Sequence, residues 1–337
     1  MIKFGVAGIP LTSKGRTYVD SIEDTANLGL NSLEVQLLRV NVSEDPAMDY
    51  AGMYPKDVED SIIVDVLRPD ESGNYNSVGT DTVIEEDDII QELFWNMARN
   101  YDDLNIGKQV AEELDIDISM HSPYYMDLLN GGEIADKSFN HLKWSLIIGR
   151  AMGAKRIITH TGFYCKTKNC SSKKAYEIYS ELARLFPHEK GYPYIGVEAS
   201  GKKDIFGTQK DLFTLADKIS DVEPILNFPH IHALNNGSLI ETKDFDHVIS
   251  AFSKYAKGDL YTEFAGVEYD NGNETKITAI KHGDLKFETL AEVLINLDQD
   301  VTIISMSPLL EHDAQYMELM YWRALLKKYQ KKLAKKA

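Results

Sequence analysis

The chain lacks several features that would assign it to a class at once. Its 337 residues include only two cysteines, Cys165 and Cys170, too few for the disulfide framework of a small secreted domain. No run of about eighteen uncharged apolar residues is present to span a membrane, and the first segment, MIKFGVAGIP, lacks the basic start and long apolar stretch of a signal peptide. We therefore expect a cytoplasmic protein with no membrane partner.

Positive charge is scarce as well. The formal net charge is −17, from 36 Lys and Arg against 53 Asp and Glu. This disfavours a protein whose whole surface binds nucleic acid, because phosphate contacts need clustered cations, although it leaves room for a local basic groove. The one basic cluster runs from Lys327 to Lys336. We interpret it as a solvated helix end whose charges complement the helix dipole, with a nucleic-acid tail as the alternative.

The two cysteines lie close together, separated by four residues in YCKTKNC. This spacing suits a metal site or a redox pair, but a zinc site needs two further ligands nearby. We predict two free thiols in a loop.

Short apolar stretches rich in β-branched residues alternate with longer helical patterns, which is typical of β/α units around a parallel sheet. Eight candidate strands can be counted: IKFGVAG from Ile2, SLEVQLL from Ser32, IDISMH from Ile116, RIITH from Arg156, YIGVEA from Tyr194, EPILNF from Glu223, DLYTEF from Asp259 and VTIISM from Val301. Helical patterns cover 18–28, 136–152, 171–185, 209–219, 243–255, 286–297 and 313–332.

These units predict one α/β domain over residues 1–337, a (β/α)₈ TIM barrel. A doubly wound open sheet is the alternative. No GxGxxG follows the first strand, so dinucleotide binding has little support.

One stretch interrupts the alternation, because residues 43–105 are far longer than a usual β/α connection. It contains a strand-like SIIVDVLR, a turn-rich PDESGNYNS, a short strand around Thr82 to Ile84 and a helical ELFWNMARNY. We predict an inserted subdomain after the second strand, the alternative being a partly disordered loop. Its EEDD at 85–88 disfavours contact with DNA phosphates and offers a surface to a protein partner.

Polar residues gather where the predicted strands end. In a β/α barrel the carboxyl ends of all strands meet at one mouth, which carries the active site. Imidazole and carboxylate together ligate zinc, manganese or iron. A single strand-end histidine is more often structural, but repetition at equivalent barrel positions favours a metal site. The candidates are His121, His160, Glu198, Asn227, His230, His232 and Glu263.

Four segments, HSPYYMDL from His121, THTGFY from Thr159, VEASGKKDIFG from Val197 and NFPHIHA from Asn227, resemble the motifs of endonuclease IV, a metal-dependent apurinic endonuclease family within the xylose isomerase-like TIM barrels. FGVAGIPL, EFAGVEY and SPLLEHDA resemble an archaeal branch of it. The similarity covers nearly everything except the insertion. It implies abasic-site cleavage in DNA repair, with three metal ions that polarise a phosphodiester and activate water.

Position by position, the resemblance makes His121 and His160 ligands of the first metal. It makes Glu198 a bridging ligand and the catalytic carboxylate, and His230 a ligand of the third metal. Tyr124 and Tyr125 fall where the family has side chains that enter DNA at the lesion, where aromatic faces can stack. The alternative is that these two tyrosines merely line the barrel mouth.

Several positions depart from the family pattern. Asn227 stands where the family has an aspartate, Glu263 where it has a histidine, and Met306 where it has a glutamate, while later ligands fall near Ile277 with no histidine before His282. We therefore expect one or two divalent ions, zinc or manganese, rather than three. His230, Glu263 and Asn227 would complete the site around the first-metal group.

Three functions follow from these residues. The first hypothesis is a hydrolase of the endonuclease IV type, with abasic DNA as its partner. The second is a single-metal sugar isomerase or epimerase that uses Glu198 and Glu263 as acid and base. The third is a catalytically degenerate paralogue with a binding or regulatory role.

Overall fold

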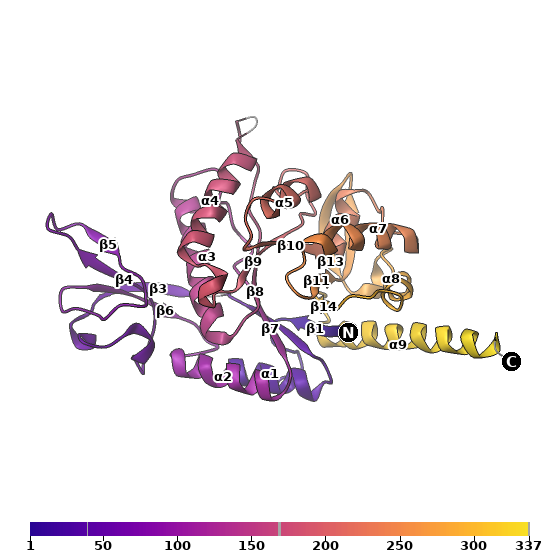
Figure 1. The fold of residues 1–337 in the computed structure, drawn as a ribbon, viewed down its shortest axis with the longest axis horizontal. Helices are drawn as coiled ribbons and strands as arrows, with labels where there is room; N and C mark the ends of the chain where they lie inside the picture. The colour runs from indigo at the N-terminus through magenta and orange to yellow at the C-terminus, as the bar shows by residue number, and fades with distance from the viewer. Residues whose placement is uncertain (39, 168–169, 336–337) are drawn as a thin grey trace.

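The computed structural model describes residues 1–38, 40–167 and 170–335. Eight parallel strands form a closed barrel in the order β1-β14-β11-β10-β9-β8-β7-β2 (Figure 1). They are β1 Ile2–Ala7, β2 Ser32–Gln36, β7 Asp117–His121, β8 Arg156–Thr159, β9 Tyr194–Glu198, β10 Val222–Asn227, β11 Leu260–Phe264 and β14 Val301–Ser305. The predicted TIM barrel and its eight strands are therefore confirmed.

Helices surround the barrel, and within the described residues they are α1 Tyr18–Asn27, α2 Tyr101–Glu113, α3 Glu133–Met152, α4 Ser171–Leu185, α5 Gln209–Ala216, α6 Phe228–Leu234, α7 Thr242–Phe252, α8 Phe287–Leu294 and α9 Glu311–Ala334. Short 3₁₀ helices occur at Met48–Tyr50, Pro55–Asp57, His188–Lys190, Ser253–Tyr255 and Ile280–His282. The seven predicted helices are present with shifted ends, and α2 and α6 are additional. None of the described helices is long and apolar enough to cross a membrane.

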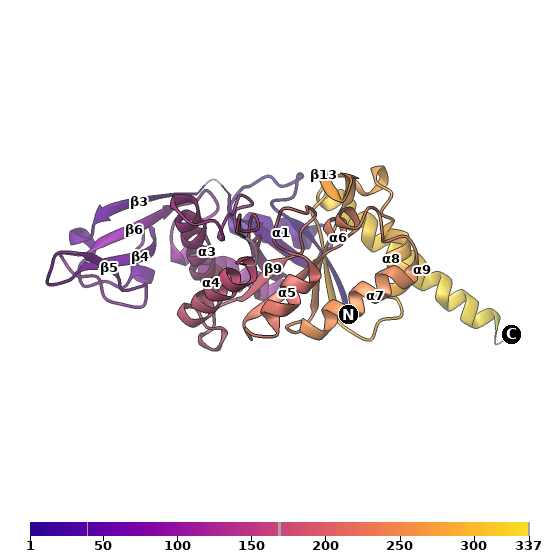
Figure 2. The same ribbon diagram turned by 90° about the horizontal axis from the view of Figure 1, so that it is seen from above.

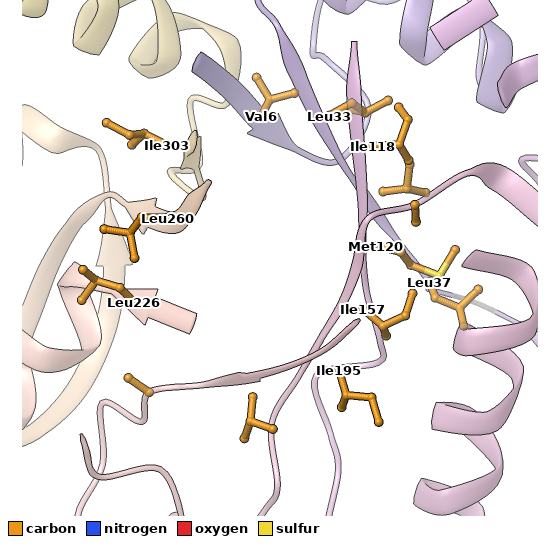
Figure 3. Close-up of a cluster of buried hydrophobic side chains, with 14 of the residues drawn as sticks. Val6, Leu33, Leu37, Ile118, Met120, Ile157, Ile195, Leu226, Leu260 and Ile303 are labelled. Atoms are coloured by element: carbon orange, nitrogen blue, oxygen red, sulfur yellow. The ribbon is translucent and has the colours of Figure 1, made fainter. Parts of the chain in front are cut away.

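Alternation along the strands separates two environments. Side chains such as Leu33, Ile157 and Leu260 point outward and pack under the helices (Figure 3). Their neighbours point into the barrel, where a small cluster around Ile225 and Tyr261 fills the middle. Because successive strand residues face opposite sides, each strand also delivers its last inward side chain to the mouth.

The segment between β2 and α2 forms a four-stranded antiparallel sheet in the order β3-β6-β4-β5. Its strands are β3 Asn41–Pro46, β4 Ile62–Pro69, β5 Tyr75–Ser77 and β6 Ile89–Phe94. The sheet extends from one side of the barrel, beyond α3 (Figure 2), and has its own apolar core, which includes Ile63, Val66 and Ile90. It is thus a folded element rather than a disordered loop.

Two predictions inside this segment were wrong. Residues 82–84 form no strand, because buried Ile84 is held in a loop by backbone hydrogen bonds to Gly52 and Met53. The predicted helix ELFWNMARNY is instead strand and turn: it begins in β6, and α2 starts only at Tyr101. The start of α2 is set by Asn100, whose side chain accepts a hydrogen bond from the backbone N–H of Asp103.

The cysteine prediction was also wrong, since Cys165 and Cys170 form a disulfide in the loop between β8 and α4. The loop brings their Cα atoms to 6.1 Å, within the range that a disulfide spans. Sequence spacing could not show this, because the approach depends on how the loop folds.

Candidate metal centre

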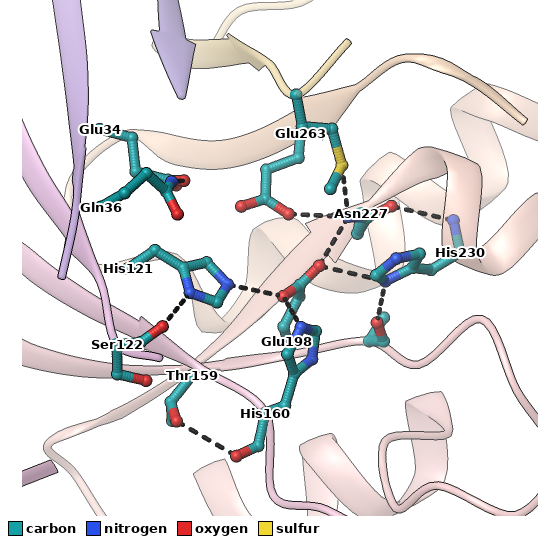
Figure 4. A network of polar contacts seen from close by, with 12 residues as sticks. Glu34, Gln36, His121, Ser122, Thr159, His160, Glu198, Asn227, His230 and Glu263 are labelled. Carbon is teal, nitrogen blue, oxygen red and sulfur yellow. Dashed lines mark hydrogen bonds and ion pairs between the residues drawn. The ribbon is translucent and has the colours of Figure 1, made fainter. Parts of the chain in front are cut away.

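Three side chains from neighbouring strand ends converge at the mouth (Figure 4). His121 ends β7, His160 directly follows β8, and Glu198 ends β9. Glu198 Oε2 lies 3.2 Å from His121 Nε2 and 3.2 Å from His160 Nε2. One donor atom from each residue lies within 4.8 Å of the others. The structure therefore brings together the predicted first-metal group.

The donor set fits a divalent ion. Two imidazoles and one carboxylate form a ligand combination that zinc takes at catalytic sites with an open position. His121 Nδ1 lies 2.5 Å from the carbonyl oxygen of Ser122, so this nitrogen donates and leaves Nε2 as the atom that faces Glu198. A hydrogen bond of this kind orients a ligating histidine and selects its tautomer.

Burial and charge set the protonation of this group. Desolvation lowers the pKa of His160 to about 4, despite the neighbouring Glu198, so its imidazole is neutral at neutral pH. Burial alone would raise the pKa of Glu198, but His160, His230 and His121 hold it well below its usual value. For His121, burial lowers the pKa, and the carboxylates of Glu198 and Glu34 outweigh it and raise the pKa. A neutral imidazole and an ionised carboxylate are the states that bind metal.

His230 joins the cluster from the first turn of α6. The side-chain oxygen of Asn227 accepts a hydrogen bond from the His230 backbone N–H at 2.9 Å, which caps the helix. The His230 ring then lies between two carboxylates, with Nδ1 3.1 Å from Glu198 Oε1 and Nε2 3.0 Å from Glu274 Oε2. Burial lowers its pKa, but Glu274 and Glu198 raise it well above the usual value. The two carboxylates therefore favour the protonated form of His230.

Glu274 was missed in the sequence. It lies in a hairpin formed by β12 Gly266–Asp270 and β13 Asn273–Thr278, which covers the edge of the mouth. The turn residues Asn271 and Gly272 both have positive φ, at 50° and 75°. An Asn-Gly pair of this kind indicates a two-residue hairpin turn, and it was the available clue. Ile277, which stands near where the family has later metal ligands, pairs with Val267 in the same hairpin.

The second side of the mouth is closed by hydrogen bonds. The Asn227 amide nitrogen lies 2.6 Å from Glu198 Oε1, 2.8 Å from Glu263 Oε2 and 3.0 Å from the Met306 sulfur, and these three acceptors share its two N–H groups. Burial, together with the charges of Glu198 and Glu34, raises the pKa of Glu263 well above its usual value. Burial and the neighbouring carboxylates thus favour the protonated, neutral form of Glu263. The roles of Asn227, Glu263 and His230 as metal ligands stay predictions.

Two further polar residues of β2 lie under this side and were also missed. Glu34 accepts hydrogen bonds from Tyr261 at 2.7 Å and from the Gln36 amide at 2.7 Å. Burial raises the pKa of Glu34. A glutamate at an inward position of an apolar strand was the clue, since charged side chains are seldom fully buried without a partner.

His232, in contrast, lies away from the cluster. Its Nε2 is 3.1 Å from Asp284 Oδ1, and its Nδ1 accepts from the Leu239 backbone N–H at 3.1 Å. Burial lowers the pKa of His232. Both ring nitrogens are therefore engaged in a structural contact.

A cavity of about 430 Å³ opens above the metal group and is lined by His160, His230, Glu274, Lys202, Tyr124, Tyr125 and Phe163, among others. The Tyr124 ring stacks on His121 with 4.4 Å between ring centroids. Tyr125 is 99% exposed. Tyr124 is therefore part of the wall of the site, whereas Tyr125 projects from its rim.

Known proteins share this architecture. The family model described as xylose isomerase-like TIM barrel matches residues 90–320. An uncharacterized protein of Methanocaldococcus jannaschii is 25% identical over 218 residues, 61% of this chain and 77% of that protein. Endonuclease IV from Thermus thermophilus gives a TM-score of 0.60 at 14% identity, covering 97% of this chain and 99% of that chain. A D-tagatose 3-epimerase-like protein gives a TM-score of 0.58 at 13% identity, covering 97% of this chain and 99% of that chain.

The two structural similarities extend to a DNA enzyme and a sugar enzyme alike, so at these identities they show the fold alone. The match to the family model covers most of the chain, including every strand that supplies the metal group. The chain belongs to the xylose isomerase-like TIM barrel family.

Proposed function

We propose that the chain is a metal-dependent hydrolase of phosphodiester bonds, of the endonuclease IV type, that acts on DNA with an abasic site. The convergence of His121, His160 and Glu198 within 4.8 Å under an open cavity carries this proposal. These three residues would hold one divalent ion, zinc or manganese. When bound, such an ion neutralises charge on a phosphate and lowers the pKa of water toward neutrality.

The residues around this group suit an anionic substrate. His230 is protonated between Glu198 and Glu274, and Lys202 lines the same cavity. Lys202 can contact phosphate oxygens locally, although the whole chain carries a net charge of −17. The ring nitrogens of His230 already face Ala199, Glu198 and Glu274. Hydrolysis adds water across one P–O bond and leaves a phosphate monoester and a hydroxyl group. The ionised Glu198 would help to orient that water.

The rim supports contact with an unstacked nucleic acid. Tyr125 and Phe163 expose their rings beside the cavity, and the Tyr124 ring lies stacked on His121. Aromatic faces stack on bases or fill the space of a missing base. We propose Tyr124 and Tyr125 as DNA contacts on this ground.

The test is cleavage of a duplex that contains one abasic analogue, with zinc or manganese supplied and an intact duplex as the control substrate. We expect a nick at the analogue that Glu198→Gln abolishes. The matched variant Glu177→Gln removes one exposed carboxylate of α4 and should cut like the parent chain. Absence of cleavage with either metal at high protein concentration would contradict the proposal.

A second candidate is a single-metal sugar isomerase or epimerase, which one observation favours. Glu198 and Glu263 accept hydrogen bonds from the same Asn227 amide nitrogen, and their pKa values move in opposite directions. Such a pair can serve as base and acid. Solvent deuterium would then enter the carbon-bound positions of a substrate sugar, whereas a phosphodiesterase would leave sugars unlabelled.

A further inference from the structure

The C-terminal part of α9 extends away from the barrel (Figures 1 and 2). It carries an exposed apolar stripe. Met320 is the last buried residue of the helix. Beyond it the helix continues to Ala334 without another buried side chain among the described residues. From Leu319 onward, five large side chains are 48–68% exposed: Leu319, Trp322, Leu326, Tyr329 and Leu333.

The spacing of these five residues is regular. They follow one another at intervals of three, four, three and four residues, which is the a and d pattern of a heptad repeat. All a positions are leucine and both d positions are aromatic. The stripe is therefore a narrow seam, as expected for contact with one other helix, and not the broad apolar face of a helix that lies on a membrane.

The seam faces away from the barrel. The opposite side of α9 carries the buried Met317 and Met320 and then continues as lysines. These lysines lie toward the end of α8, where Lys328 Nζ donates to the carbonyl oxygen of Ile295 at 2.7 Å. The helix thus turns its charged side to its own chain and its apolar side to solvent. A helix that packs only on its own domain has the opposite arrangement.

The charges beside the seam favour a second copy of the same helix. With Leu319, Leu326 and Leu333 at a, Glu318 falls at position g and Arg323 at the following e. In a parallel pair, position g of one helix faces position e of the other. The two-fold symmetry of the dimer would therefore form two equivalent Glu318–Arg323 ion pairs between the copies. Lys327, Lys328, Lys331 and Lys335 take outer positions, where they do not repel across the seam.

From this geometry we infer that the chain forms a dimer in which the α9 seams of two copies pack together as a short parallel coiled coil. The inference is independent of the proposed hydrolase activity, because no residue of the seam lies at the mouth.

Sedimentation velocity of the full chain at micromolar concentration tests it. We expect a dimer, and a monomer for Leu326→Gln with unchanged thermal unfolding at low protein concentration. The adjacent Lys327→Gln is the matched control and should stay dimeric. A monomeric parent chain, including one that binds only vesicles of anionic lipid, would overturn the inference, as would a Leu326→Gln variant that remains dimeric.

A charge exchange tests the identity of the partner. Glu318→Arg places arginine opposite arginine and should raise the dimer dissociation constant at least tenfold. The double variant Glu318→Arg/Arg323→Glu restores opposite charges and should recover the parent value. Failure of the double variant to recover would rule out the parallel self-pairing.

Discussion

Each end of the barrel holds a buried ionic cluster under a tyrosine ring, and the two clusters differ in the cation that they use. At the amino-terminal end, Arg156 donates to Glu223 Oε2 at 2.9 Å and to Asp259 Oδ1 at 2.9 Å, and its guanidinium lies 4.6 Å from the Tyr261 ring. At the mouth, three histidines surround Glu198, and the Tyr124 ring covers His121.

This difference in cation indicates that the lower cluster stabilises the fold and that the upper cluster can bind a ligand. Arg156 is always charged and both carboxylates pair with it, so the lower cluster needs no added cation, although Asp259 Oδ2 has no hydrogen-bond partner among the described residues. The upper cluster has imidazoles that can be neutral, with donor atoms that point at one another. The same barrel thus places an ion cluster with its own cation at the stabilising face and a set of potential metal ligands at the functional face, as the fold generally does.

Removal of the lower cation should have the largest effect. Arg156→Leu leaves Glu223 and Asp259 buried without their partner, which costs about 3–5 kcal/mol in the free energy of unfolding. Urea denaturation at pH 7 measures it, and exposed Arg184→Leu on α4 is the matched control. Zinc stoichiometry should not change. A loss below about 1 kcal/mol would mean that the lower cluster is not what stabilises this end.

Removal of the carboxylate of Glu198 at the mouth should lower metal affinity. Glu198→Gln should weaken zinc binding at least about 100-fold, about 3 kcal/mol of binding free energy, in competition with a chromophoric chelator. Glu223→Gln in the lower cluster is the counterpart and should lower stability with unchanged zinc affinity. Equal zinc affinity in the Glu198→Gln variant and the parent chain would remove the distinction between the two ends.

The protonation of His160 provides a smaller test in metal-free protein. Its folded pKa of about 4 lies below the usual 6.5, so the unfolded chain takes up this proton first as pH falls. The contribution of neutral His160 to the free energy of unfolding is therefore fully present above pH 6.5 and is lost as the pH falls toward 4. Between pH 6.5 and 5 the parent chain should lose about 2 kcal/mol more than His160→Asn. Equal slopes in chelator-treated samples would contradict this pKa.

The tyrosine over the mouth should contribute least. Tyr124→Leu removes the stacking on His121 and should cost about 1 kcal/mol, measured by thermal unfolding. Tyr124→Phe keeps the ring and should unfold like the parent chain. A larger loss for Tyr124→Phe than for Tyr124→Leu would show that the hydroxyl, and not the ring, matters at this position.

The parts of the fold that depend on local pattern could be predicted. The eight strands were found because each is a short apolar run, and His121, His160 and Glu198 were found because strand ends meet at one mouth. The segment ELFWNMARNY was wrongly predicted as a helix because the spacing of Trp95, Met97 and Tyr101 resembles a helical pattern. These three residues are buried because they pack into the barrel core.

The residues that sequence reasoning missed depend on contacts between distant segments. Glu274 reaches His230 only because a hairpin folds back over the mouth, and Glu34 meets Tyr261 across the barrel interior. The protonation of His230 and Glu263 follows from those contacts. Residue type and spacing along one strand contain no information on such pairs.

The most direct test of the central claim is a crystal structure with anomalous scattering at the zinc edge, from protein loaded with zinc. The account predicts an ion bound to His121 Nε2, His160 Nε2 and Glu198, with at most one further ion in the mouth. A mouth without an anomalous peak at these three residues, or three ions there, would contradict it.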